Sequence, residues 1–209
     1  MTKVISFISR KGGSGKTTNA INLCTSLKAS RKKVMLIETD PNYTLIATRK
    51  MEIFKQGLKE DKLFPIKAST DDKVANQLDE WVANGQFDYI IVDSAGKTTD
   101  AGIKELCLAS DMVLVTTSLT QNDLLVAYQT VKDLKPAQNL KPGLKLVVLP
   151  NRIHSHTRIK TIKDVLNGLE VDMLDNYVPQ KKIFTTPSTH KAEKKYKPIA
   201  HLIIKKLND

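Results

Sequence analysis

The chain has 209 residues, with 33 Lys and Arg against 22 Asp and Glu, which gives a formal charge of +11 at pH 7. Its length suits one domain with a buried core, and 41% hydrophobic with 26% charged residues is a folded rather than a disordered composition. No apolar run approaches the roughly 20 residues that cross a bilayer, and Cys24 and Cys107 are too far apart to suggest a disulfide framework, so we expect a cytoplasmic protein.

Short β-branched runs alternate along the chain with segments of helical periodicity. Nearly continuous apolar runs predict buried strands at Lys3–Ile8, Val34–Glu38, Tyr89–Asp93, Met112–Thr116 and Leu144–Leu149, with a weaker candidate at Phe64–Lys67. Helical spacing predicts helices at Thr17–Ala29, Val74–Ala83, Ile103–Ala109 and Asp123–Leu134, and a basic helical tail within 181–209, helical in pattern from Pro187 onward. This alternation predicts a single α/β domain over residues 1–209, with a mostly parallel central sheet flanked by helices on both faces.

The segment 11–18, KGGSGKTT, follows the first predicted strand and opens the first predicted helix. In this context a glycine-rich loop turns successive backbone N–H groups toward phosphate oxygens, and the positive end of the helix adds to their attraction. We expect Lys16 to reach the β- and γ-phosphates of a nucleotide and the Thr17 hydroxyl to ligate Mg²⁺. The expected nucleotide-binding residues of the loop are Gly12, Gly13, Ser14, Gly15, Lys16, Thr17 and Thr18.

The start of this loop departs from the ordinary phosphate-loop pattern, because Arg10 stands where that pattern has glycine. Position 11 carries a lysine instead, and the resulting form K-G-G-x-G-K-[ST] resembles the deviant Walker A loop of the ParA/MinD family of ATPases. The resemblance implies a P-loop NTPase fold, hydrolysis of ATP with Mg²⁺, and a homodimer that forms on ATP binding. It also implies that Lys11 crosses the dimer interface and contacts the phosphates of the partner's nucleotide.

The second predicted strand ends in Glu38-Thr39-Asp40-Pro41-Asn42. A carboxylate just past the C-terminal end of a parallel strand projects into the ligand crevice. The family pattern at this place is D-x-D-P-Q, and the resemblance assigns to Asp40 the positioning of the attacking water. Glu38 and Asn42 depart from that pattern, so their roles stay open, and a helix cap or an Asx turn before Pro41 is the structural alternative for Asp40.

The strand Tyr89–Asp93 ends in an acid, which is the Walker B arrangement. We expect Asp93 to hold Mg²⁺, directly or through water. The small residues Ser94, Ala95 and Gly96 would leave room for a mobile second switch near the γ-phosphate. At this place the chain is most similar to the small plasmid-partition ATPases of the ParF type.

Residues 150–153, PNRI, follow a late strand where a guanine-specific GTPase would show N-K-x-D. In the resembling family this stretch frames the adenine together with a later loop around a proline. The resemblance therefore implies ATP as the nucleotide, with Asn151, Arg152 and Pro179 near the base.

Positive charge is concentrated at the C-terminal end, where the last 29 residues hold eight lysines against two acids, a net charge of +6. A lysine cluster attracts phosphates without reading bases, so it predicts salt-dependent, non-specific DNA binding. The expected DNA-binding residues are Lys181, Lys182, Lys191, Lys194, Lys195 and Lys197.

Together these features resemble a small ParA-type ATPase of plasmid or chromosome segregation. The resemblance implies that the ATP-bound dimer holds nucleoid DNA and that hydrolysis, stimulated by a ParB-like centromere-binding adaptor, releases it. Two alternatives stay open. A MinD-type positioning ATPase would lay the basic tail on a membrane, although its apolar stripe, Ile199, Leu202, Ile203 and Leu207, suits packing onto the core. A metabolic ligase of the dethiobiotin-synthetase type would need an added small-molecule pocket.

Overall fold

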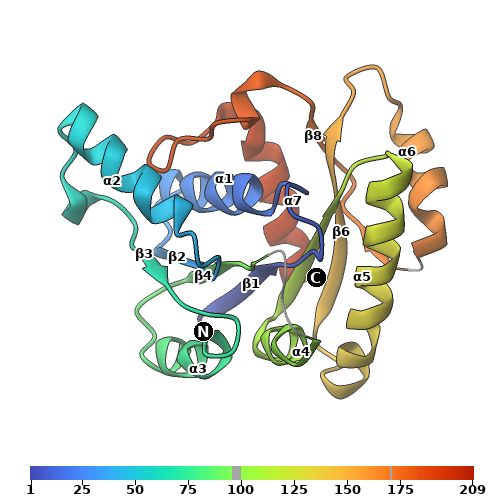
Figure 1. The fold of residues 1–209 in the computed structure, drawn as a ribbon, viewed down its shortest axis with the longest axis horizontal. Coiled ribbons are helices and arrows are strands. Elements are labelled where there is room, and N and C mark those ends of the chain that lie inside the picture. The colour runs from blue at the N-terminus through green and yellow to red at the C-terminus, as the bar shows by residue number, and fades with distance from the viewer. Residues whose placement is uncertain (96–99, 170) are drawn as a thin grey trace.

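The computed structural model describes residues 1–95, 100–169 and 171–209. Eight strands of the described chain form a sheet in the order β3-β2-β4-β1-β5-β6-β7, with β8 paired to β6, and every pairing is parallel (Figure 1). The strands are β1 (Lys3–Phe7), β2 (Val34–Glu38), β3 (Ile66–Ala68), β4 (Tyr89–Asp93), β5 (Met112–Thr117), β6 (Lys145–Ile153), β7 (Asp172–Met173) and β8 (Val178–Pro179).

Helices cover both faces of this sheet and enclose two hydrophobic cores. The helices are α1 (Lys16–Ala29), α2 (Thr44–Gln56), α3 (Val74–Ala83), α4 (Asp100–Ala109), α5 (Gln121–Leu140), α6 (Ile159–Leu166) and α7 (Lys197–Asn208). Apolar residues of α1 and α7 pack on one face, and those of α3, α4, α5 and α6 pack on the other. The α/β fold with a parallel sheet and two helical layers is therefore confirmed.

Helices α2 and α6 were not predicted from the sequence, and α4 and α5 were predicted too short. Helix α2 buries only Leu45 and Arg49, so its apolar periodicity is weak, and α6 has only eight residues. Helix α5 continues through Pro136 to Leu140, beyond the predicted end. Proline frees the carbonyl four residues earlier, and here that carbonyl belongs to Lys132, an exposed residue.

The C-terminal tail is α-helical only from Lys197, after 3-10 turns at Lys182–Phe184 and Lys194–Tyr196, so the predicted start of the helix at Pro187 was wrong. The preceding stretch is held by its own side chains, because the Ser188 hydroxyl accepts hydrogen bonds from the backbone N–H groups of His190 and Lys191. Pro198 in the first turn of α7 fits the position where a missing N–H has no cost. The predicted apolar stripe of α7 packs into the core, with Ile199 and Ile203 almost fully buried.

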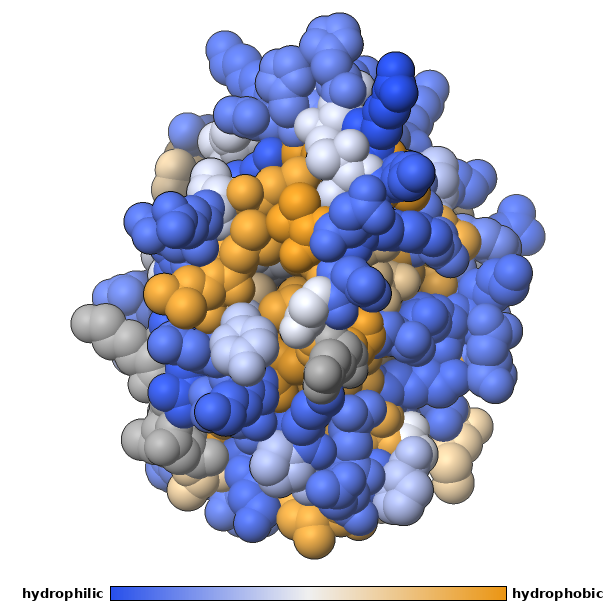
Figure 2. Space-filling model, turned by 90° about the vertical axis from the view of Figure 1, so that its right-hand side faces the viewer, coloured by the Kyte–Doolittle hydropathy of each residue, from blue (hydrophilic) through white to orange (hydrophobic). Residues whose placement is uncertain are grey.

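The outer face of α5 and α6 is hydrophilic around an apolar patch (Figure 2). The exposed apolar residues of these two helices include Leu125, Tyr128 and Val165, which are 57%, 50% and 43% exposed. Within the described ranges, no helix is long and apolar enough to cross a membrane.

The parallel register brings the predicted site residues to one edge of the sheet. Strand β1 lies between β4 and β5, and Asp93 at the end of β4 pairs with Phe7 of β1 and with Glu38 of β2. The chain order reverses beside β1, which is where open α/β sheets bind ligands. The glycine loop, Asp40 and Asp93 therefore lie together at one edge of the sheet.

Candidate nucleotide-binding site

The glycine loop joins β1 to α1, and two of its glycines adopt left-handed backbone conformations. Gly13 has φ of 74° and Gly15 has φ of 99°. A Cβ atom at Gly15 would lie 2.1 Å from Nδ2 of Asn151, whose amide donates a 2.8 Å hydrogen bond to the carbonyl of Ser14. Gly15 is thus required both by its backbone conformation and by the close approach of Asn151.

The N-terminus of α1 has no capping side chain. Its N-cap residue is Gly15, and its first turn contains no acid. Lys16 is 6% exposed, and its Nζ donates to the carbonyls of Lys11 and Ser9 at 3.3 and 3.4 Å. Burial lowers the pKa of Lys16, while Asp93 and Asp40 oppose this shift. The loop thus combines backbone donors, a helix dipole and a cation, the set that binds phosphate.

Asp93 lies next to Thr17, as expected of two residues that share a metal ion. The carboxylate is 2% exposed, and its Oδ1 has no hydrogen-bond partner among the described residues. Burial raises the pKa of Asp93 to about 7, although a hydrogen bond from Thr17 and the charge of Lys16 act in the opposite direction. An unpartnered buried oxygen beside a hydroxyl fits a hard cation such as Mg²⁺.

Asp40 forms an Asx turn, which was the structural alternative to its predicted role in positioning water. Its Oδ1 accepts hydrogen bonds from the backbone N–H and the side-chain amide of Asn42, both at 2.9 Å. Glu38 instead caps α2, since its carboxylate accepts from the backbone N–H groups of Leu45 and Ile46 at 2.8 and 3.2 Å. The glutamate in place of the family aspartate therefore anchors the helix that follows Asp40.

Sequence reasoning missed one acid of the site, Asp71, which follows the short strand β3. The Thr39 hydroxyl donates to Asp71 at 2.5 Å and accepts from the backbone N–H of Ala95 at 2.9 Å. The segments after β2, β3 and β4 are thereby joined. The same signal that identified Asp93, an acid after a strand, applies to Asp71, but β3 has only three residues. Gly96, the last residue of the predicted second switch, lies outside the described residues.

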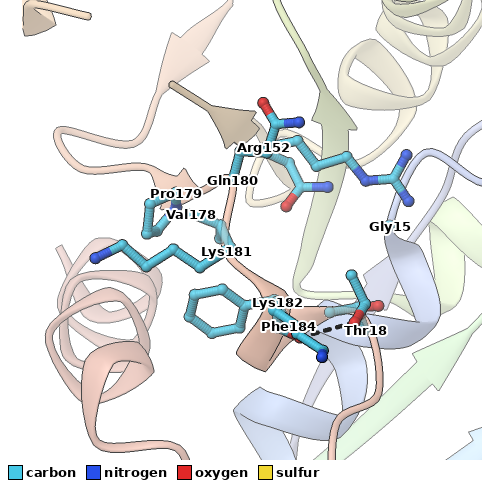
Figure 3. A pocket seen from close by; sticks show the side chains of 11 residues that line it. Gly15, Thr18, Arg152, Val178, Pro179, Gln180, Lys181, Lys182 and Phe184 are labelled. Carbon is cyan, nitrogen blue, oxygen red and sulfur yellow. Dashed lines mark hydrogen bonds between the residues drawn. The ribbon is translucent and has the colours of Figure 1, made fainter. Parts of the chain in front are cut away.

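A cavity of about 450 Å³ opens beside the loop (Figure 3). Gly15 and Thr18 line one side, and Asn151, Arg152 and Pro179 line it from β6 and β8. Arg152 has a left-handed φ of 56° at the place where the β6–β8 register shifts. The three residues predicted to frame the adenine therefore share one cavity with the phosphate loop.

Asn151 is also part of a buried hydrogen-bond chain that reaches the C-terminal segment. The Asn19 amide donates to the carbonyl of Gly15 at 2.8 Å and to Oδ1 of Asn151 at 3.3 Å. The Tyr196 hydroxyl then donates to Oδ1 of Asn19 at 2.9 Å. The conformation of the loop thus depends on residues more than 100 positions away in sequence.

The lysines predicted to bind DNA are all exposed, but they occupy two places. Lys181 and Lys182 line the cavity described above. Lys191, Lys194, Lys195 and Lys197 belong to the segment that ends in the first turn of α7. A hydrogen bond and charge repulsion from Lys195 lower the pKa of Lys181, so the two groups are neighbours in space.

The segment that carries Lys191, Lys194 and Lys195 is tied down at both ends. At one end the Arg49 side chain donates to the carbonyl and the hydroxyl of Thr189, each at 2.7 Å. At the other end lies Tyr196, which is fully buried. The lysines are therefore presented on a short, anchored loop beside α1 and α2.

Lys11 points away from the cavity toward the start of α5, where its ammonium forms an ion pair with Asp123. Ser118 donates a 2.5 Å hydrogen bond to the other oxygen of that carboxylate. Burial alone would raise the pKa of Asp123, but hydrogen bonds from Lys11 and Ser118 outweigh it and hold that pKa below its usual value. Asp123 is a second residue that sequence reasoning missed, because it was seen only as the start of a helix.

Comparison with known proteins places the chain in a family. The model of the VirC1 protein family matches residues 2–203. The VirC1 protein of Rhizobium rhizogenes is 28% identical over 175 residues, which are 81% of this chain and 74% of that protein. The septum site-determining protein MinD of Bacillus subtilis is 28% identical over 210 aligned residues, covering 83% of this chain and 75% of that protein.

A solved structure with the same fold is a putative plasmid partition protein of Borrelia burgdorferi bound to AMPPNP. Its TM-score is 0.68 at 17% identity, and the match covers 98% of each chain. An identity this low shows the fold alone. Because the VirC1 family model spans nearly the whole sequence, this protein belongs to the VirC1 family and, with it, to the ParA/MinD family of P-loop ATPases.

Proposed function

We propose that this chain is an ATP-dependent DNA partition ATPase, with one ATPase domain over residues 1–209. The observation that carries the proposal is the buried Asp93 carboxylate, which has an oxygen unpartnered among the described residues and lies next to Thr17 and the Lys16 charge. A Mg²⁺ ion bound with a nucleotide would neutralise this carboxylate. The match to a family of P-loop ATPases supports the same conclusion.

In this proposal the nucleotide lies across the glycine loop and the neighbouring cavity. Its phosphates lie on residues 12–18, where the N-terminus of α1 has no competing acid, and Lys16 stabilises the charge that develops on them. Its base enters the cavity lined by Asn151, Arg152 and Pro179. Thr17 and Asp93 would hold Mg²⁺, which would supply positive charge beside the phosphates.

Hydrolysis requires a positioned water, and we assign that task to Asp40. In its present Asx turn only Oδ1 accepts hydrogen bonds from Asn42, so Oδ2 is the oxygen that would orient the water. Asp40 directly follows Glu38 and Thr39, which are fixed by α2 and by Asp71. The fixed neighbours leave Asp40 as the part of this segment that can respond to the nucleotide.

In the ATP-bound state the protein binds DNA as a dimer. Lys11 of each subunit contacts the phosphates bound by the other, so ATP brings two subunits together. The exposed lysines beside the cavity and on the anchored loop, Lys181, Lys182, Lys191, Lys194, Lys195 and Lys197, then hold nucleoid DNA through its phosphates. A ParB-like adaptor that stimulates hydrolysis would end this state, and the protein would return to the cytoplasm.

The test is retention on random-sequence DNA with ATP, ADP or no nucleotide, for the wild type and Lys16→Ala. We expect retention by the wild type with ATP alone and none by the variant. Replacing Lys194 and Lys195 with alanine should make the salt dependence shallower, by about one unit of slope for each lysine that binds a phosphate. Lys28→Ala, which removes an exposed lysine at the far end of α1, is the matched control. Equal retention in all three nucleotide states would contradict the proposal.

A MinD-type membrane function is the second candidate, since MinD is among the relatives. The stripe of α7 that would face a membrane is buried in the core at Ile199, Ile203 and Leu207. Membrane binding would therefore need α7 to detach. Flotation with anionic liposomes and ATP would favour this candidate, and ATP-dependent DNA retention without flotation would favour partition.

A further inference from the structure

Lys11 has a partner within its own subunit. Its ammonium pairs with Oδ1 of Asp123, in the first turn of α5. In the proposed dimer the same ammonium must reach a phosphate of the other subunit. The Lys11 ammonium cannot pair with Asp123 of its own subunit and contact a phosphate of the other subunit at the same time, so the two contacts compete.

The carboxylate is the fixed member of this pair. Ser118 donates to its Oδ2 at 2.5 Å, the Thr120 hydroxyl accepts from the Asp123 N–H at 3.4 Å, and the Thr117 hydroxyl donates to its carbonyl at 3.1 Å. The Asp123 side chain is 15% exposed, whereas that of Lys11 is 41% exposed. When the pair separates, Lys11 moves and Asp123 stays in place.

The neighbouring basic residue is held in a similar way, which makes it a useful reference. Nε of Arg10 lies 2.9 Å from Oδ2 of Asp133, on the same helix, and the two side chains are 40% and 41% exposed. Helix α5 thus binds both basic residues that lead into the phosphate loop. Only Lys11 belongs to the signature that reaches across the dimer, so only its pair should matter for dimer formation.

The end of α5 is open to an approaching subunit. Leu125 and Tyr128, within two turns of Asp123, are 57% and 50% exposed. The Lys11 side chain is itself 41% exposed, so a second copy that approaches this side of the molecule can reach it.

We propose that Asp123 is a positioning residue that retains Lys11 within its own subunit and yields it to the partner's nucleotide only when ATP is bound. This inference rests on the proposed function, because it presumes that Lys11 acts across the dimer. A partly exposed ion pair stabilises its geometry only modestly, so the exchange is reversible. Asp123 therefore makes the free energy of dimer formation less favourable, and an ADP-bound subunit does not dimerise.

The experiment compares dimer dissociation constants by analytical ultracentrifugation, with Mg²⁺ and either a non-hydrolysable ATP analogue or ADP. Asp123→Asn keeps the acceptor for Ser118 but removes the charge. We expect its dimer with the analogue to be about tenfold tighter than that of the wild type, since two ion pairs are released per dimer. Asp123→Glu restores the charge and should return dimerisation toward the wild-type value.

Two further variants make the result specific. Asp133→Asn removes the partner of Arg10 on the same helix and should leave dimerisation unchanged. In a Lys11→Ala background, Asp123→Asn should have no effect, because it acts through the lysine.

Unchanged or weaker dimerisation of Asp123→Asn, or an equal gain in dimerisation without Lys11, would overturn the positioning role. If Lys11→Ala alone dimerises like the wild type, the trans role of Lys11 in the proposed function falls as well. The two failures are therefore distinguishable.

Discussion

Helices α1 and α5 both begin at the C-terminal edge of the sheet, yet their first turns differ in chemistry. The start of α1 has Gly15 as its N-cap, no capping side chain and no acid. The start of α5 is capped by the Thr120 hydroxyl, and Asp123 supplies a carboxylate to its first turn. Both ends carry a partial positive charge. The protein neutralises the start of α5 with its own side chains, whereas in the proposed function the start of α1 would bind the phosphates of a nucleotide.

The largest effect is expected from Gly15→Ala, which places a methyl group at the N-cap of α1. The new Cβ would overlap the Asn151 amide, and the left-handed backbone adds about 1–3 kcal/mol of strain. We expect lost nucleotide binding and a clear fall in the free energy of unfolding, measured by urea denaturation. Gly85→Ala is the control, because Gly85 has φ of 61° with nothing within 4 Å of its Cβ position. If both variants lose equal stability, the contact with Asn151 has no influence.

A smaller effect is expected from giving α1 the acid that α5 already has. Thr18→Asp puts a carboxylate into the first turn of α1, on the wall of the cavity. Charge repulsion should weaken ATP binding by about tenfold, as measured by isothermal titration calorimetry. Thr18→Asn has nearly the same shape without the charge. An affinity of Thr18→Asp equal to that of Thr18→Asn would show that charge at this helix end does not select the ligand.

Tyr196→Phe tests how the open end of α1 is held in place. The variant removes the hydroxyl that donates to Asn19 and so releases the amide that supports Gly15. Losing a buried hydrogen bond should lower the free energy of unfolding by about 1–2 kcal/mol and weaken nucleotide binding slightly. Tyr128→Phe removes a half-exposed hydroxyl and serves as the control. Equal stability of the two variants would exclude a structural role for the Tyr196 hydroxyl.

The smallest effect concerns the acid of α5. Because the folded-state pKa of Asp123 lies below its usual value, its contribution to stability is present above the unfolded pKa and is lost as pH falls through the folded pKa. The melting temperature of the wild type should therefore exceed that of Asp123→Asn near neutral pH, and the difference should begin to shrink below about pH 4 and vanish only once the pH lies below the folded pKa. A difference that is constant over this range would mean that the charge is irrelevant.

The sequence predicted strands β1 to β6 and the glycine loop between β1 and α1 because both depend on local patterns, but it missed the two-residue strands β7 and β8. Strands buried on both faces need continuous apolar runs, and the loop needs Gly13 and Gly15 for left-handed backbone. Asp40 and Asp93 could be placed at one edge because parallel strands end together. The family membership confirms the resemblance that the loop indicated.

Contacts between distant segments could not be predicted in this way. Nothing around Asp123 indicates that it meets Lys11, and Tyr196 in a lysine-rich stretch gives no sign of its bond to Asn19. The role of Glu38 became clear only with α2, a helix that buries too few residues to be detected. Such pairs are set by tertiary packing rather than by periodicity, so only the fold reveals them.

The anchoring of the lysine-rich loop has an entropic consequence. Arg49 fixes the backbone at Thr189, and Tyr196 is buried at the other end, so only residues 190–195 lie between the two anchors. Ordering a free residue costs about 1–2 kcal/mol of conformational entropy, and binding to a flexible tail would bear that cost at every contact. Here much of the cost is met during folding, so a polyanion encounters charges that are already arranged.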